Sequence, residues 1–572
     1  MWPFSHSVPE LKPHEVGTCL HANVRASAVD AVTYDYIIVG GGSAGCCLAS
    51  RLSEDPSVTV LLLERGNVTD TWASKVPLIS SDLFRSGTPA ARWTTQPMPE
   101  VDGRTLEVVR GEALGGTSRV NGLVYTRGAP GDYNLWKELG HEGWGYDDLL
   151  PYFVKSEKTL SQPPSSFRGS EGPWQNQTFK EVHYKFARHI LSATQAIGIP
   201  PIQDVNSPKA SAAGHATLDI CVDRNIYRAS TYRAFLPPNL AQARKKHLKI
   251  CTDTVALRIE TETSSGKVRA VGVHFGDVSG NERSPKYYAK AQREVILCAG
   301  ALGSPQLLQL SGLGPADHLK EKGIPVVRDM PGVGSHLQDH PGVPVMYEVP
   351  VSDTLFVLEK QPLAAMIEFL KYVTIGRGLF VLPFTPTSIF VPSRLLNKNS
   401  EVIDASAPAL TGADLPDIEI MPIPYNASDV VIDGKGIFSL LGALIKPKSV
   451  GTQPRGLHHP AQGLRLALRI AEQVRTQGYL MKDLQVPETE NEVDMDRFIR
   501  KNMRTTYHYA STCRMAREAE GGVVDDDLRV YGVQGLRVCD TSVFPEIVAT
   551  HLMAPAVVVA EKCADLIKTT WK

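Results

Sequence analysis

The stretch YDYIIVGGGSAGCCLASRL, Tyr34 to Leu52, decides the fold of the region around it. Its first residues are β-branched or apolar on both faces, which is typical of a buried parallel strand. Three glycines follow, and the residues after them favour a helix. VTVLLLERG, Val58 to Gly66, then predicts a second buried strand. Together these elements form a βαβ unit of about thirty residues, the length expected of a dinucleotide-binding motif.

The glycines between the strand and the helix have the spacing G-x-G-x-x-G. Gly40 permits the tight turn, Gly42 lets the backbone approach a pyrophosphate, and Gly45 lets the helix lie close to the sheet. The helix N-terminus offers unpaired N–H groups and a partial positive charge to the phosphates. Glu64 ends the second strand, where a carboxylate accepts hydrogen bonds from ribose hydroxyls. The pattern therefore predicts FAD or NAD rather than NADP, with a tight turn that binds nothing as the alternative.

Composition excludes several functional classes. The 572 residues carry 60 basic and 61 acidic side chains, a net charge of -1, so we expect no nucleic-acid partner. No run of about 18 apolar residues occurs, and the N-terminus lacks the pattern of a secretory signal. We therefore expect a cytoplasmic protein without a membrane span. The nine cysteines form no C-x-x-C pair, which indicates reduced, mostly buried thiols and no metal site.

The rest of the chain mixes both kinds of secondary structure. Residues 248–277 alternate between apolar and polar side chains and predict an antiparallel meander. Residues 291–314 predict another buried strand followed by a helix, and residues 460–477 predict an amphipathic helix. Residues 554–570 predict a terminal helix, whereas residues 331–450 are rich in proline and aromatic residues and show weak periodicity.

Three blocks of sequence resemble one enzyme family, the glucose–methanol–choline (GMC) oxidoreductases. The blocks are GEALGGTSRVNGLVYTRG (111–128), GALGSPQLLQLSGLG (300–314), and a C-terminal run made of HYASTCRM (508–515), LRVYGVQGLRVCDTSVFP (528–545) and HLMAPAVVVAEKCADLI (551–567). With the βαβ unit they span most of the chain in the family's order. Since members of this family are FAD enzymes, the resemblance selects FAD over NAD.

The resemblance implies an α/β (α+β) fold with two domains. A Rossmann-like FAD-binding domain would be assembled from residues 34–150, 220–335 and 500–572. A substrate-binding domain built on an antiparallel sheet would take residues 151–219 and 336–499. Residues 1–33 would form an N-terminal extension, which we expect to lie on the surface.

The resemblance also assigns contacts with FAD. The matching positions, from the phosphate turn to the ribityl chain, are Gly40, Gly42, Ser43, Ala44, Gly45, Glu64, Thr117, Asn121, Gly122, Val124, Ala256, Asp540, Thr541 and Leu552. For the apolar members of this set, simple core packing is the alternative. Some family members attach FAD through a histidine just before the loop asparagine, where this chain has Val120, so we expect non-covalent FAD. Glu112 and Ser511 depart from the family, which usually has a basic residue and a glycine there.

Two histidines are the candidates for catalysis. Oxidation of an alcohol on flavin requires loss of the hydroxyl proton and transfer of a hydride to flavin N5. A histidine is suited to accept the proton, because its pKa lies near neutrality. By resemblance, His508 is the base and His551 forms a hydrogen bond with the substrate oxygen.

The substrate is predicted less sharply. GLFVLPFTPTSIFVP brings Phe380, Phe384 and Phe390 close together, and Tyr507 precedes His508. An aromatic segment is more often core than pocket, but the sequence shows no sugar-binding cluster of Asn, Gln and Asp, so an apolar or aryl primary alcohol is the favoured substrate. Choline would need a carboxylate or an aromatic cage, and none can be assigned. The electron acceptor would be O2 or a quinone-type acceptor, and the sequence predicts no oligomeric state.

Three other functions use the same scaffold. A hydroxynitrile lyase keeps the histidines and stays open as an alternative. A light-driven fatty-acid decarboxylase lacks a histidine at the position of His508, which argues against it. A flavoprotein without turnover would have no reason to retain both His508 and His551.

Overall fold

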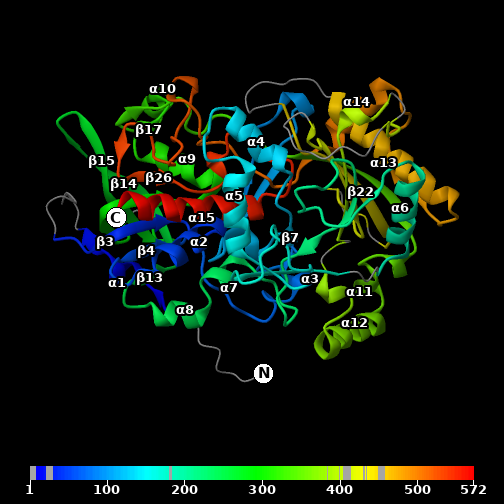
Figure 1. Cartoon of the computed structure of the whole chain (residues 1–572), viewed down its shortest axis with the longest axis horizontal. Helices are drawn as coiled ribbons and strands as arrows, with labels where there is room; N and C mark the ends of the chain where they lie inside the picture. The colour runs from blue at the N-terminus through cyan, green and yellow to red at the C-terminus, as the bar shows by residue number, and fades with distance from the viewer. Residues whose placement is uncertain are drawn as a thin grey trace.

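The protein is built around two large β-sheets that lie at opposite ends of its long axis (Figure 1). The computed structural model describes residues 8–20, 30–179, 183–281, 283–382, 384, 386–397, 400–403, 414–428, 432, 434–448 and 458–572. The mixed α/β architecture confirms the predicted fold class.

The first sheet contains the predicted βαβ unit. Its strand order is β1-β13-β4-β3-β16-β15-β14, and β4, β3, β13 and β16 run parallel. The strands are β3 (Thr33–Val39), β4 (Val60–Leu63), β13 (Leu248–Cys251), β14 (Thr254–Ser264), β15 (Lys267–Asp277) and β16 (Lys286–Leu297). The hairpin β14–β15 is antiparallel, as the alternation predicted, whereas β13 is parallel to β4.

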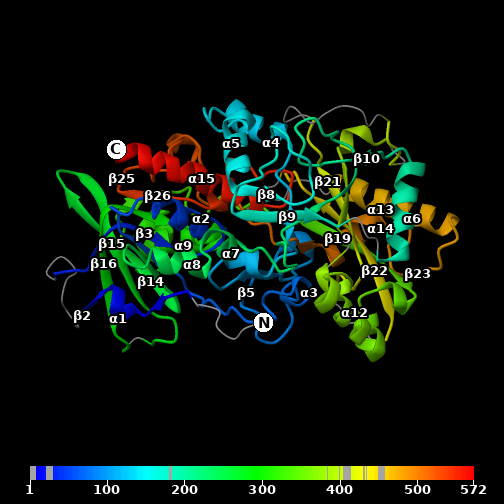
Figure 2. The same ribbon diagram turned by 60° about the horizontal axis from the view of Figure 1, so that its bottom comes forward.

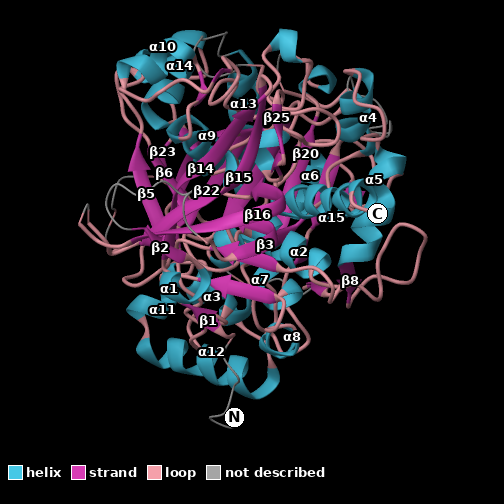
Figure 3. Ribbon diagram, turned by 90° about the vertical axis from the view of Figure 1, so that its left-hand side faces the viewer, coloured by secondary structure: helices cyan, strands magenta, loops and turns pink. Residues whose placement is uncertain are grey.

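Two helices lie beside this sheet (Figure 3). They are α2 (Ser43–Leu52) and α15 (Met553–Thr570), which contact each other. The central strand β3 has β4 on one side and β16 on the other, so the chain order reverses at β3. Ligands of open α/β sheets bind at such a reversal, outside the carboxyl ends of the strands.

The second sheet is mostly antiparallel, as expected. Its order is β10-β11-β20-β21-β22-β19-β23, made of Pro201–Ile202, Gly214–Thr217, Thr387–Val391, Ile418–Ile423, Gly436–Leu444, Pro341–Val349 and Lys482–Gln485. Helices α6 (Lys185–Ala196) and α13 (His458–Thr476) contact each other, and α13 contacts β22 and β19 (Figure 2). Leu466, Ile470 and Val474 of α13 are buried at helical spacing, which confirms the predicted amphipathic helix.

The N-terminal residues differ from the prediction of a surface extension. Strand β1 (Glu10–Leu11) pairs with β13, and β2 (Thr18–Leu20) pairs with β16. Val8 and Val16 are buried. Residues 8–20 therefore belong to the sheet, because β1 satisfies the backbone groups that the edge of β13 would otherwise expose. Residues 1–7 and 21–29 lie outside the described part, and the predicted domain boundaries stay predictions.

Candidate functional site

A cavity of about 870 Å³ opens at the carboxyl ends of β3 and β16 and extends to the second sheet. Its size is typical of small-molecule and cofactor sites. Val39 and Cys298 line it from the first sheet, and Met421 and Leu441 line it from the second. All of the residues predicted to contact FAD, except Gly45, and both candidate catalytic histidines lie on its wall.

The three glycines of the phosphate turn serve three different purposes. Gly40 has a φ of +102°, and a Cβ there would lie 2.5 Å from the carbonyl oxygen of Cys298. A Cβ on Gly45 would lie 1.9 Å from the carbonyl oxygen of Gly40, so α2 can approach the turn only without a side chain. At Gly42 a Cβ would meet only the oxygen of Cys298, at 3.7 Å. Gly42 therefore leaves space for a ligand rather than for neighbouring protein, and this open cradle at a helix N-terminus fits a pyrophosphate.

Glu64 is fixed at the end of β4 by backbone donors. Its two carboxylate oxygens accept hydrogen bonds from the N–H groups of Gly41 (2.7 Å) and Gly66 (2.8 Å). Burial raises the pKa of Glu64 to about 7. The carboxylate is thus held rigidly on the cavity wall, where the sequence predicts contact with a ribose.

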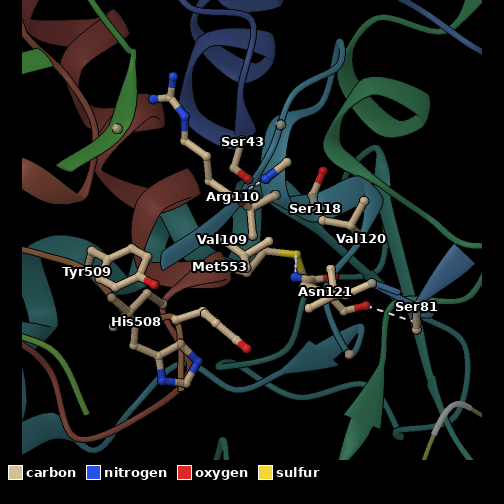
Figure 4. A pocket seen from close by; sticks show the side chains of 18 of the residues that line it. Ser43, Ser81, Val109, Arg110, Ser118, Val120, Asn121, His508, Tyr509 and Met553 are labelled. Atoms are coloured by element: carbon tan, nitrogen blue, oxygen red, sulfur yellow. Dashed lines mark hydrogen bonds between the residues drawn. The ribbon is translucent and has the colours of Figure 1, made fainter. Parts of the chain in front are cut away.

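Arg228 holds the loop that contains Asn121, one of the residues that the resemblance assigns to FAD. This buried guanidinium donates hydrogen bonds to the carbonyl oxygens of Asn121 (2.7 Å) and Ser118 (3.0 Å) and to Oδ1 of Asn121 (2.9 Å). Burial lowers the pKa of Arg228 to about 9. The Asn121 amide also donates to Sδ of Met553, 3.0 Å away (Figure 4). Sequence reasoning missed Arg228, since no motif that we used contains it.

Asp540 joins two segments of the site. Its Oδ2 accepts hydrogen bonds from Gly300 N–H (2.9 Å) and Ser304 Oγ (2.6 Å), and its Oδ1 accepts one from Ser542 N–H (2.8 Å). Burial raises the pKa of Asp540. The next residue, Thr541, donates its hydroxyl to the carbonyl oxygen of Tyr509. These bonds fix the residues just after His508 at the wall of the cavity.

The structure brings the two candidate catalytic histidines together. The ring centroids of His508 and His551 are 4.9 Å apart, and their planes are almost perpendicular. Nε2 of His551 lies 3.1 Å from Oε1 of Glu419, a buried carboxylate on β21. Nδ1 of His508 lies 3.0 Å from Nδ1 of a third histidine, His340. Neither Glu419 nor His340 was predicted, although an acidic residue inside the apolar run IEIMPI (418–423) was a possible signal for Glu419.

Hydrogen bonds favour one tautomer of His508. The Thr506 hydroxyl lies 2.8 Å from the carbonyl oxygen of His340 and 3.2 Å from Nδ1 of His508. When this hydroxyl donates to the carbonyl oxygen, its own oxygen accepts from Nδ1 of His508, so Nδ1 carries the hydrogen. The other ring nitrogen, Nε2, then holds a lone pair. This is the tautomer that a general base requires.

Burial keeps His508 and His340 uncharged. It lowers the pKa of His508 well below 6.5, and the nearby His551 and His340 lower it further. Burial lowers the pKa of His340 to about 3. The backbone N–H of His508 donates to Oδ1 of Asp339 (2.8 Å), whose pKa burial raises to about 6. At neutral pH, His508 is therefore a neutral proton acceptor.

Only some of the aromatic residues predicted for the substrate pocket reach the cavity. Phe384 and Tyr507 line it. Phe380 contacts the ring of Phe369, with centroids 5.8 Å apart, and Phe390 is buried in the core on β20. Phe380, Phe384 and Phe390 all belong to or pack against one hydrophobic core, so the alternative of core packing describes Phe380 and Phe390.

Glu112 and Ser511, which depart from the family pattern, each interact with another side chain. Oε2 of Glu112 lies 3.3 Å from Nε of Arg65, an ion pair on the cavity wall. Ser511 has a φ of +72°, a conformation that favours glycine, and its hydroxyl donates to Oε1 of Gln338 (3.0 Å). The hydrogen bond thus offsets part of the backbone strain at Ser511.

Comparisons with known proteins identify the family. The GMC oxidoreductase models match residues 34–342 and 449–560. The chain is 34% identical over 562 residues to the oxygen-dependent choline dehydrogenase of Pseudomonas fluorescens (strain SBW25), covering 94% of each chain. It is 32% identical over 593 residues to dehydrogenase str4 of Strobilurus tenacellus, again covering 94% of each. An FAD-dependent oxidoreductase from Chaetomium thermophilum has the same fold, with a TM-score of 0.79 and 25% identity over 94% of this chain and 100% of that one.

The chain therefore belongs to the GMC oxidoreductase family. It is an FAD-dependent oxidoreductase that acts on CH–OH donors. The open cradle at Gly42 and the fixed carboxylate of Glu64 fit this cofactor. Among the described residues, no helix combines the length and apolarity needed to cross a bilayer.

Proposed function

We propose that this enzyme oxidises a small apolar or aryl primary alcohol, with His508 as the base. The observation that carries the proposal is the hydrogen-bond pattern at His508. Its Nδ1 lies within hydrogen-bond distance of Thr506 and His340, which leaves Nε2 to hold the lone pair, and its ring centroid lies 4.9 Å from that of His551. The residues matched to FAD by resemblance would hold the cofactor along the same cavity wall.

Each histidine has a separate task in this reaction. Nε2 of His508 accepts the hydroxyl proton, and the low pKa of His508 keeps that nitrogen free at neutral pH. His551, held at Nε2 by Glu419, orients the substrate oxygen. Bound FAD supplies the hydride acceptor, so the alcohol loses one proton and one hydride and leaves as an aldehyde. O2 or a quinone-type acceptor then takes the two electrons.

The substrate class follows from apolar and aromatic side chains of the cavity. Phe384, Met421, Ile423, Leu441 and Tyr507 line it together with the histidines. Such a lining favours an apolar or aryl group next to the reacting CH–OH carbon. Choline is the competing substrate, because several relatives are named choline dehydrogenases.

A substrate panel read by flavin reduction tests the proposal. Anaerobic mixing with benzyl alcohol should bleach the yellow flavin absorbance faster than mixing with choline. His508→Ala should retain FAD and slow bleaching by about 10²–10⁴-fold, the usual contribution of a general base. His318→Ala, on the exposed surface of α10 (Ala316–Glu321), is the control and should behave as wild type. Rapid bleaching by His508→Ala would refute the assignment, and turnover of mandelonitrile without bleaching would favour a lyase.

We also propose that FAD is held without a covalent bond. Val120 lines the cavity and offers no nucleophile. Acid precipitation should therefore release all of the flavin into the supernatant, and yellow colour retained in the pellet would contradict this. A cytoplasmic location stays a prediction.

A further inference from the structure

Helix α12 (Pro362–Ile375) presents an apolar face to solvent. We call this the docking face, and its residues, with their exposed fractions, are Leu363 (66%), Met366 (53%), Ile367 (44%), Leu370 (48%) and Val373 (50%). Their spacing of i, i+3, i+4, i+7 and i+10 places all five on one side of the helix. A surface helix normally carries charged and polar residues on this side.

The opposite side of α12 anchors the helix to the protein. Tyr372 is buried, and its hydroxyl donates to the carbonyl oxygen of Ile226 (3.0 Å). The ring of Phe369 meets those of Trp72 and Phe380, with centroids 5.8 Å away in both cases. The fold therefore fixes α12 through its inner side and does not use the docking face.

Charged residues flank the docking face at both ends. Glu359 and Lys360 precede it and Arg377 follows it, and all three are exposed. Lys371 is exposed too, but its Nζ forms an ion pair with Glu368 (2.6 Å), which also accepts from Leu379 N–H (2.9 Å). Lys360 and Arg377 therefore place one basic residue at each end of the apolar stripe, which is complementary to a lipid surface with anionic headgroups.

The segment directly before the docking face lines the cavity. Helix α11 (Val357–Lys360) precedes α12 and contacts it, and the two project together from one corner of the molecule (Figure 1). Phe356, Leu358 and Glu359 line the cavity from this segment. Phe84, which is 76% exposed, also lines the cavity. The docking face is therefore joined to the cavity wall through α11.

We propose that the docking face binds the surface of an anionic lipid bilayer, with α12 lying in the plane of the interface. The helix has 14 residues, and a helix needs about 20 to span a bilayer, so it would lie on the membrane rather than cross it. A second copy of the chain fits less well. Five half-exposed side chains offer a few hundred Å², whereas a stable dimer buries about 800 Å² per partner. This binding does not depend on the proposed substrate, although it would place the cavity mouth beside apolar molecules dissolved in lipid.

Vesicle co-sedimentation of the FAD-loaded full chain tests the proposal. The wild type should sediment with vesicles of phosphatidylcholine and phosphatidylglycerol. Met366→Glu combined with Leu370→Glu should lower the partition coefficient at least about tenfold, because two charges enter the interface. The matched control, Leu480→Glu with Val493→Glu, changes residues that are 79% and 68% exposed elsewhere and should leave binding unchanged. Flavin content and thermal unfolding would show that all variants fold.

A second measurement does not rely on the double variant. Cys19 is exposed and the other eight cysteines are buried, so Cys19→Ser with Leu370→Cys gives one accessible thiol for a polarity-sensitive dye. Its emission should shift to the blue when vesicles are added. The proposal is overturned if the wild type stays in solution, if both double variants bind alike, or if the dye does not respond. It is also overturned if light scattering shows a dimer that the α12 variant dissociates, since a second copy would then cover the face.

Discussion

Replacing Gly42 by valine should separate cofactor binding from folding. A Cβ at this position would lie 3.7 Å from the carbonyl oxygen of Cys298, an ordinary van der Waals contact. The backbone at Gly42 has a φ of -74°, which any residue can adopt. The protein itself can therefore accommodate the valine, whose side chain would fill the cradle in front of α2.

The expected loss of affinity follows from the donors that the valine would cover. The first N–H groups of α2 have no partner within the helix and are available to the pyrophosphate. Hydrogen bonds to a charged group contribute about 1.5–3 kcal/mol each. Losing two of them would cost about 3–6 kcal/mol, which weakens FAD binding by about 10²–10⁴-fold.

Gly45→Ala, three residues further along the chain, should lower the stability of the fold rather than block the cofactor site. Its Cβ would lie 1.9 Å from the carbonyl oxygen of Gly40, so α2 or the turn must move. Such overpacking costs about 1–3 kcal/mol or more in free energy of unfolding. We therefore expect Gly45→Ala to lower Tm, whereas Gly42→Val should leave the Tm of the apoprotein nearly unchanged.

The assay combines flavin content with thermal unfolding. The ratio of flavin to protein absorbance is measured after purification, and the apoprotein is then titrated with FAD. Gly276→Val is a matched control, because a Cβ there meets its nearest neighbour, the oxygen of Pro285, also at 3.7 Å but lies outside the cavity wall. The reasoning would be refuted if Gly42→Val retained wild-type FAD, or if Gly45→Ala had the Tm of the wild type.

Four further predictions concern the histidine cluster and Ser511. Because the pKa of His508 lies well below 6.5, the rate of flavin reduction should stay flat near neutral pH and fall only on acidification below 6.5; a midpoint above 6.5 in stopped-flow data would contradict this. The same shift means that the unfolded chain binds more protons below 6.5, so the free energy of unfolding should fall with acidification there, as urea titrations can show. Glu419→Gln keeps an acceptor for His551 and should retain most of kcat. Glu419→Leu removes the acceptor and should lower kcat by a larger factor than it changes KM. An equal loss of kcat in both variants would show that the charge of Glu419 matters rather than the orientation it gives to His551. Ser511→Gly removes the strain at φ +72° but also the bond to Gln338, so Tm should change by only a few degrees, and a loss of more than about 3 kcal/mol would show that the hydrogen bond dominates.

The first sheet could be predicted because its signals are local. The strand before Gly40, the glycine spacing and Glu64 lie within one βαβ unit, and each position has one physical reason to be occupied as it is. The N-terminal strands could not be predicted in this way. Strand β1 has two residues, too few for a period, and it becomes a strand only because the edge of β13 offers it hydrogen-bonding partners.

The same distinction between local sequence signals and long-range contacts applies to the residues of the candidate site. The cavity-lining residues predicted from the sequence stand in long motifs, so each could be assigned by position. His340 and Arg228 act through contacts with residues 168 and 107 positions away in the chain, and no local pattern marks such pairs. Phe390 was assigned to the pocket because it lies near Phe384 in the sequence, but all residues of β20 are buried and Phe390 does not line the cavity.

The low pKa of His508 has a consequence for how the site must operate. A base whose pKa lies well below the working pH is always ready to accept a proton, but it gains less from doing so. The negative charge that develops on the substrate oxygen therefore needs support from another group. His551, with its ring centroid 4.9 Å from that of His508, gives that support only when its Nδ1 also carries a hydrogen, because its Nε2–H donates to Oε1 of Glu419. The two histidines would then be interdependent, with His508 accepting the proton and His551 stabilising the oxygen that loses it.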